Sequence, residues 1–271
     1  MSAPTIPAPD PPEASPPETL RPLGGLRHLI LFLVSAVALF FTVQMAAFTV
    51  LLHRATVENP DLTRRELTRQ VIEREQFNAF TLVPVQTIFF ALLLLLLYAF
   101  VRQRGIAFVE ALALQPIAGK ELALLAAAGA LLAITGQATN ALFPPPQELP
   151  IERLFSSQAA ALLVIVASLA VAPLAEELVF RGYIYRLVEG LAGRAPAILT
   201  SGLLFGAIHV PQLYPGVAQM GLIVCIGLVF SLARARTGST LTSVCLHFAY
   251  NATLSALFLF SDEFRQLAAF S

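Results

Sequence analysis

The chain has 271 residues, of which 57% are hydrophobic and 13% are charged, and its mean hydropathy is +0.75. This composition excludes a water-soluble domain and is typical of a polytopic membrane protein embedded in a lipid bilayer. Because 17 Lys and Arg residues balance 17 Asp and Glu residues, no basic surface for nucleic acid is indicated. We therefore expect an all-α, polytopic transmembrane helical bundle.

Residues 1–22 differ from the rest of the chain, since they hold eight prolines and almost no large apolar side chains. Such a segment cannot bury enough surface to offset its conformational entropy, so we predict a disordered Pro-rich N-terminal arm. We divide the remainder into residues 23–150, a set of N-terminal transmembrane helices, and residues 151–271, a second transmembrane core.

Seven apolar segments approach the roughly 20 residues that cross a bilayer as a helix. The first of them, at 24 residues, is too long for the apolar part of a cleaved signal peptide, and we interpret it as a retained anchor. A segment at about 59–76 has apolar residues on one face and charged residues on the other, which predicts a short amphipathic helix on the membrane surface. We expect seven crossings, with eight as the alternative count. The apolar segments are Leu29–Leu52, Phe80–Val101, Leu122–Phe143, Ala159–Phe180, Ala195–His209, Val217–Ala233 and Thr240–Phe260.

The basic residues between the segments predict an orientation. Residues 1–28 and the connections 102–121, 181–194 and 234–239 hold ten Lys and Arg residues, against seven on the opposite side, of which five lie within residues 53–76. Positive charge favours the cytoplasmic side, so we expect a cytoplasmic N terminus. The chain has one Lys and sixteen Arg among many Ala and Leu residues, which indicates a GC-rich bacterial genome and hence a bacterial plasma (inner) membrane.

Charged side chains stand at the end of the fourth apolar segment, where Glu176, Glu177 and Arg181 form an EExxxR pattern. A charge inside a helix that crosses hydrocarbon costs about 2.5–3.5 kcal/mol on insertion scales, so such residues indicate function. On a helix Glu177 and Arg181 are four residues apart and can pair, whereas Glu176 points about 100° away and stays free. Pro173 is expected to bend the helix just before them.

Two further segments carry polar groups that can join this site. His209 ends the fifth segment, and His247 and Asn251 lie one helical turn apart on the seventh. If the fourth and fifth segments form a hairpin that turns at 190–194, Glu176 lies 14 residues before the turn and His209 lies 15 after it. At about 1.5 Å rise per residue both side chains would lie at the same depth.

Three stretches of sequence, APLAEELVFRGYIY, SGLLFGAIH and ARTGSTLTSVCLHFAYN, resemble the three motifs of the CPBP (Abi) family, which includes CAAX prenyl proteases and bacteriocin-processing enzymes. The resemblance covers about residues 159–255 and implies that residues 151–271 are a catalytic core with an internal, cytoplasm-facing cavity. It also implies that Glu176 with His209 activates a water, and that His247 and Asn251 complete the site and stabilise the oxyanion. Glu177 and Arg181 match the remaining, supporting motif positions.

The chemistry of peptide hydrolysis agrees with these roles, because it needs a general base and an oxyanion donor, each worth about 100-fold or more. Glu176, His209 and His247 are alternatively a possible ligand set for catalytic zinc, which takes three protein ligands. The chain lacks the HExxH spacing, so the sequence slightly favours catalysis with no cofactor and leaves zinc open.

We therefore predict an intramembrane protease that hydrolyses a membrane-associated peptide or protein tail. Prenylated CAAX proteins are scarce in bacteria, so a bacteriocin, a signalling peptide or a membrane-protein tail is the expected substrate. The alternative is a non-catalytic membrane regulator or bacteriocin immunity protein of the same scaffold. A proton-coupled transporter is a third reading, although no second copy of the EExxxR segment indicates the internal repeat that transporters usually show.

Overall fold

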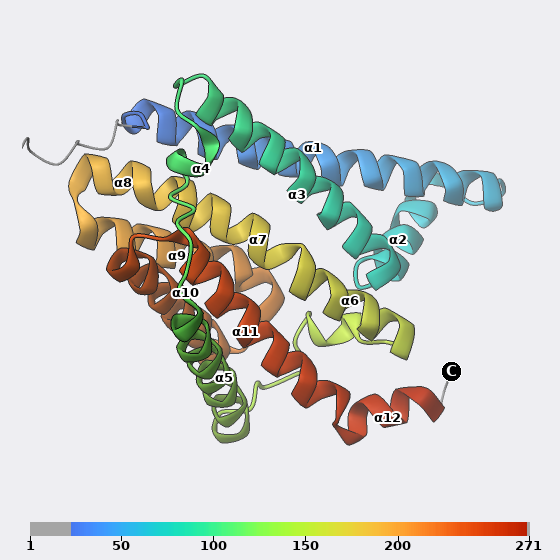
Figure 1. The fold of residues 1–271 in the computed structure, drawn as a ribbon. Coiled ribbons are helices and arrows are strands. Elements are labelled where there is room, and N and C mark those ends of the chain that lie inside the picture. The colour runs from blue at the N-terminus through green and yellow to red at the C-terminus, as the bar shows by residue number, and fades with distance from the viewer. Residues whose placement is uncertain (1–22, 270–271) are drawn as a thin grey trace, which may run out of the picture.

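The computed structural model describes residues 23–269, and over this range every regular element is a helix (Figure 1). The expectation of an all-α bundle is confirmed. The predicted disordered arm, residues 1–22, lies outside the described residues.

Seven helical segments of the described chain are long and apolar enough to cross a bilayer, as predicted, and the protein is an integral membrane protein. Their ends agree with the apolar segments to within a few residues, except that two of the helices run well beyond them. They are α1 (Leu26–Glu58), α3 (Ala79–Arg102), α5 (Gly119–Leu142), the composite segment Gln158–Ala192, α9 (Arg194–Leu213), α10 (Val217–Thr237) and α11 (Thr240–Leu259).

The fourth crossing is a chain of four helical pieces: α6 (Gln158–Ala170), α7 (Ala172–Glu177), the π-helix η2 (Leu178–Ile184) and α8 (Tyr185–Ala192). The break between α6 and α7 lies at Val171, two residues before Pro173. The helix is interrupted here because the backbone nitrogen of Pro173 has no proton to donate to the preceding turn. The apolar segment ends at Phe180, but the helix continues to Ala192, as a hairpin that turns at 190–194 requires. The charge of Arg181 is neutralised within the protein by Glu177. Gly193 then ends the helix with a φ of 87°, a backbone conformation that favours glycine.

Four short elements lie at the ends of the crossings. The predicted amphipathic helix is α2 (Arg64–Glu75), which begins at a capping box formed by Thr63 and Glu66. Its apolar residues Leu67 and Val71 are buried, and the helix packs against α1. The sequence did not predict α4 (Phe108–Ala111), the 3-10 turn η1 (Glu152–Leu154) or α12 (Asp262–Ala269).

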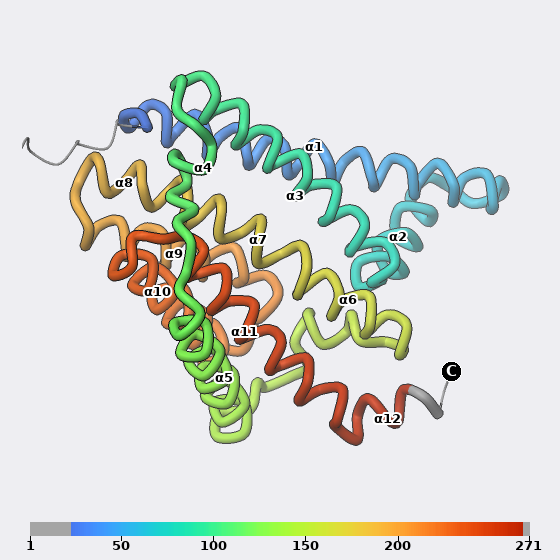
Figure 2. The backbone as a smooth tube through the Cα atoms, viewed as in Figure 1, coloured from blue at the N-terminus to red at the C-terminus, as the bar shows by residue number. Residues whose placement is uncertain are grey.

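The composite crossing lies in the middle of the bundle. Figure 1 shows α1 and α3 side by side along one side of α6–α8, with α5, α9, α10 and α11 on the other side. The tube in Figure 2 shows the connection after α4 running across the bundle to α5. Every motif residue therefore comes from the composite crossing or from a helix that packs against it.

Glycines let several of these helices approach closely. A Cβ on Gly202 of α9 would lie 2.7 Å from the Leu228 side chain of α10, and one on Gly129 of α5 would lie 2.6 Å from Ala249 of α11. Small residues at crossing points are the usual means by which membrane helices pack, since lipid provides no hydrophobic force between them. These contacts set α9 against α10 and α5 against α11, and so help to place the side chains that these helices carry.

Candidate active site

The charged residues of the EExxxR motif are inside the protein rather than at its surface. Glu177 and Arg181 are fully buried, and the neighbouring Glu176 is only 9% exposed. Of the two histidines in the predicted site, His247 is buried and His209 is half-buried. A charge in such a setting is tolerated only when it is paired and hydrogen-bonded.

Arg181 has a hydrogen-bond partner for each of its three guanidinium nitrogens. Nη1 donates to Glu177 Oε1 at 2.9 Å, Nη2 donates to the carbonyl oxygen of Gly227 at 2.6 Å, and Nε donates to Ser231 Oγ at 3.3 Å. Gly227 and Ser231 both belong to α10. The guanidinium is thus held in one orientation and ties the composite crossing to α10.

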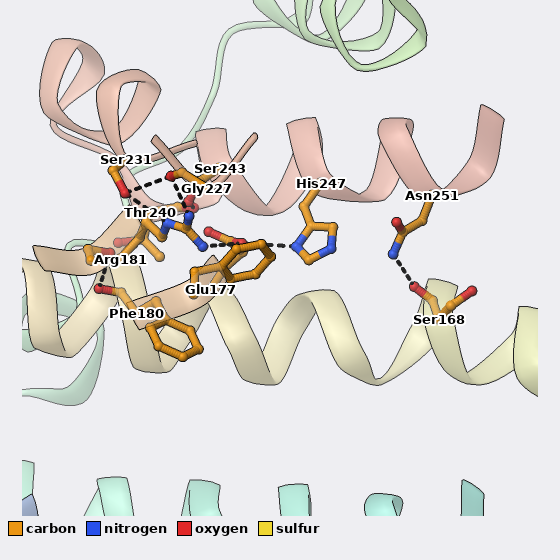
Figure 3. A network of polar contacts seen from close by, with 12 residues as sticks. Ser168, Glu177, Phe180, Arg181, Gly227, Ser231, Thr240, Ser243, His247 and Asn251 are labelled. Carbon is orange, nitrogen blue, oxygen red and sulfur yellow. Dashed lines mark hydrogen bonds and ion pairs between the residues drawn. The ribbon is translucent and has the colours of Figure 1, made fainter. Parts of the chain in front are cut away.

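Glu177 joins this ion pair to the seventh crossing. Its Oε1 accepts a second hydrogen bond, from Nδ1 of His247 at 2.9 Å, whereas its buried Oε2 has no hydrogen-bond partner among the described residues. Figure 3 shows Arg181, Glu177 and His247 in a row between the two helices. The carboxylate can only accept, so the bond places a proton on Nδ1 of His247 and leaves Nε2 free for other work.

Aromatic rings form the walls of the site. The ring of Phe205 lies 4.5 Å from the guanidinium carbon of Arg181, 4.5 Å from the centre of the His209 ring and 5.7 Å from that of His247. Phe230 stacks on His247 at 4.9 Å. These rings limit the rotation of both imidazoles and keep water away from the buried charges, which strengthens the electrostatic interactions among them.

His209 is held by its own helix. Its Nδ1 lies 2.7 Å from the carbonyl oxygen of Phe205, one turn earlier on α9. A carbonyl oxygen can only accept, so this contact also places the proton on Nδ1 and leaves Nε2 as a free acceptor. The two histidines thus have the same tautomer, set in one case by a carboxylate and in the other by the backbone.

Glu176 makes the fewest polar contacts of the three charged residues in the motif. Its carboxylate makes no hydrogen bond to any of the described residues, although it interacts electrostatically with Arg181. Glu176 and Glu177 are adjacent in sequence but differ in their hydrogen bonding, since Oε1 of Glu177 accepts two hydrogen bonds. The ion pair of Glu177 with Arg181 is therefore present as their spacing predicts, and the separate role of Glu176 stays a prediction.

Asn251 points from α11 toward α6, on the same side of the helix as His247 (Figure 3). Its Nδ2 donates to the carbonyl oxygen of Ser168 at 2.8 Å. An amide nitrogen carries two protons, so one remains for another acceptor. Asn251 therefore links two helices in addition to any catalytic role.

The structure brings some of the predicted residues into direct contact and others only close together. Glu177, Arg181 and His247 form one hydrogen-bonded chain, and His209 reaches it through the ring of Phe205. Sequence reasoning missed the contact between Glu177 and His247 and the central place of the Phe205 ring. A signal for the latter exists, since Phe205 and His209 are four residues apart on one helix.

Metal binding by Glu176, His209 and His247 was left open by the sequence. Among residues 23–269 the structure gathers no group of three or more His, Cys, Asp or Glu side chains that could hold a metal ion. The metal requirement therefore stays a prediction. The internal cavity also stays a prediction. A surface hollow of about 390 Å³ lies elsewhere and is lined by residues of α2, namely Glu66, Arg69, Gln70, Glu73 and Arg74.

Comparison with protein families gives one match in the region of this site. Residues 158–253 match the family described as type II CAAX prenyl endopeptidase, Rce1-like. The matched segment begins at the first residue of α6 and ends in α11, and it contains all six predicted site residues. Comparisons with curated proteins and with solved structures gave no match.

Proposed function

With residues 158–253 the chain belongs to the CPBP family of type II CAAX prenyl endopeptidases, a family of intramembrane proteases, and on that premise we propose that it is itself an active peptide hydrolase. The proposed reaction is hydrolysis of a peptide bond in a membrane-associated peptide or protein tail, by a water that Glu176 and His209 activate. We place the enzyme in a bacterial plasma membrane with its N terminus in the cytoplasm.

The observation that carries this proposal is the different state of the two adjacent glutamates. Oε1 of Glu177 accepts hydrogen bonds from both Arg181 and His247, so this carboxylate is already paired with a cation. Glu176 is nearly buried and has no hydrogen-bond partner in the described chain, so it can accept a proton from a water. A carboxylate without a cation or a hydrogen-bond donor of its own can bind and deprotonate a water, as a general base must.

The remaining groups supply the other needs of the reaction. The free Nε2 of His209 can bind the attacking water or receive its proton through Glu176. As the water attacks the carbonyl carbon, negative charge develops on the carbonyl oxygen, and the second Nδ2 proton of Asn251 can stabilise it. His247, whose Nδ1–H stays on Glu177, adds a second donor once its free Nε2 has also taken up a proton. The proton taken by Glu176 is then delivered to the leaving amine, which breaks the C–N bond.

The test compares the membranes of cells that express the wild type, a Glu176→Gln variant or a Glu263→Gln variant. Newly formed peptide termini are profiled by mass spectrometry. Glu263 is an exposed glutamate at the start of α12, so its variant controls for the loss of a carboxylate anywhere in the chain. We expect cleavage products with the wild type and with Glu263→Gln, and none with Glu176→Gln.

The wild type, the Glu176→Gln variant and a strain that lacks the chain separate the enzyme from a non-catalytic regulator. A regulator would act through binding, so Glu176→Gln would behave as the wild type does, while deletion of the whole chain would produce a phenotype. Identical terminal profiles for Glu176→Gln and the wild type would therefore refute the peptidase proposal.

A further inference from the structure

We propose that Glu177 is a positioning residue for the reaction, which holds the His247 imidazole in the Nδ1–H tautomer and directs Nε2 to the substrate. The inference rests on the proposed peptidase function. It assigns to the second glutamate of the motif a task that differs both from that of Glu176 and from a simple ion pair with Arg181.

The first step of the argument is that a single oxygen accepts two hydrogen bonds. Oε1 of Glu177 lies 2.9 Å from Arg181 Nη1 and 2.9 Å from His247 Nδ1. A simple ion pair would need only the first of these bonds. The second reaches a residue 70 positions away on another crossing, so the carboxylate connects the guanidinium to the imidazole.

The second step is that Arg181 is itself held by hydrogen bonds to α10 and so orients the carboxylate. Its Nη2 and Nε are bound to Gly227 and Ser231 of α10, and its side chain is fully buried. Glu177 in turn has no exposed surface. A side chain held in this way presents Oε1 to His247 at a constant angle, which is how supporting residues orient a catalytic histidine in general.

The third step is that no other described group sets the His247 ring. Its remaining close neighbours are the rings of Phe205 and Phe230, which restrict rotation but neither donate nor accept in the ring plane. The aromatic walls therefore leave the choice of tautomer to Glu177. Without an acceptor at Nδ1, the proton is free to move to Nε2, and the ring can turn over.

The geometry predicts different effects for two substitutions of Glu177. In the Glu177→Gln variant, the Nη1–H of Arg181 requires an acceptor, so the amide oxygen takes the place of Oε1 and continues to accept from His247. In the Glu177→Leu variant no acceptor remains. Glu177→Gln should keep the tautomer and lose only the negative charge, whereas Glu177→Leu should lose both.

The experiment measures the tautomer and the turnover separately. Purified full-length protein in mild detergent is labelled with ¹⁵N-histidine, and the ring nitrogen shifts of its four histidines are assigned by single His→Asn variants. Turnover is measured with a fluorogenic peptide that contains a cleavage site found by the terminal profiling. We expect Nδ1–H at His247 in the wild type and in Glu177→Gln, and loss of this state in Glu177→Leu.

For turnover we expect kcat of Glu177→Leu to fall by about 100-fold or more, with KM within a few-fold of the wild type. The kcat of Glu177→Gln should be at least about tenfold higher than the kcat of Glu177→Leu. A folded Glu177→Leu variant that keeps the Nδ1–H state, or a Glu177→Gln variant as impaired as Glu177→Leu, would overturn the inference.

Two controls keep the result interpretable. If Glu177→Leu fails to fold, the Glu177→Leu/Arg181→Met double variant removes both buried charges and allows the same tautomer measurement. If the wild type and Glu176→Gln cleave nothing, the proposed function fails, but the NMR measurement still decides whether Glu177 sets the tautomer of His247.

Discussion

Replacement of Arg181 by methionine should destabilise the protein strongly. The change removes three hydrogen bonds and leaves the Glu177 carboxylate buried without its cation, with 0% of either side chain exposed in the wild type. Loss of one partner from a buried pair costs about 3–5 kcal/mol, because the remaining charge is uncompensated. The carbonyl of Gly227 also loses its donor, at about 1–3 kcal/mol for an unsatisfied buried group. Since these effects overlap, we expect a total near the upper end of the first range.

The double variant Glu177→Leu/Arg181→Met tests whether the cost comes from the unpaired charge. Replacement of both members of a buried ion pair by apolar side chains is often neutral or stabilising, so the double variant should be more stable than Arg181→Met alone. Unfolding of the wild type, both single variants and the double variant by SDS in mixed micelles gives the four corners of a double-mutant cycle. Wild-type stability of Arg181→Met, or a double variant less stable than either single one, would refute the reasoning.

Four further outcomes are expected. His209→Ala should lower turnover by at least about 100-fold with little change in thermal unfolding, because the side chain is only half-buried; near-wild-type turnover of the purified variant would contradict its role. Deletion of residues 1–22 should leave turnover within a few-fold in the same assay, and a large loss would mean that this arm delivers substrate. Gly202→Val should cost about 1–3 kcal/mol of stability, since a Cβ there meets Leu228 at 2.7 Å, whereas Gly221→Val, with nothing within 4 Å of its Cβ, should unfold as the wild type does. Exhaustive chelation should leave turnover intact, with well under one zinc per chain by elemental analysis, and a zinc ion that turnover requires would overturn the metal-free mechanism.

The crossings could be predicted because hydropathy and length almost suffice for them. All seven are present, and α3, α5 and α11 begin and end within three residues of the predicted segments. The composite crossing was the exception in length, since hydropathy falls at Arg181 whether or not a partner neutralises that charge. Only the contact with Glu177, which depends on burial, shows why the helix can continue through this residue.

The site could be predicted where the partners lie on one helix and not where they lie on two. The pairing of Glu177 with Arg181 follows from their spacing of four residues. The bond between Glu177 and His247 joins the fourth and seventh crossings, and the bond between Asn251 and Ser168 does the same. Nothing in the local pattern selects these partners, because they depend on how far each helix is shifted along its axis and turned about it.

The order of the two glutamates along the chain therefore has a structural cause. The second of them is followed four residues later by Arg181, and the pair is anchored to α10 by Gly227 and Ser231. That anchor holds Glu177 in an ion pair and leaves Glu176, about 100° around the helix, without a hydrogen-bonded partner in the described part of the chain. An exchange of the two roles would require the arginine to move by one position, to residue 180, where Phe180 now packs against Phe205. The EExxxR spacing is thus the simplest way to place one free carboxylate and one fixed carboxylate next to each other inside a membrane.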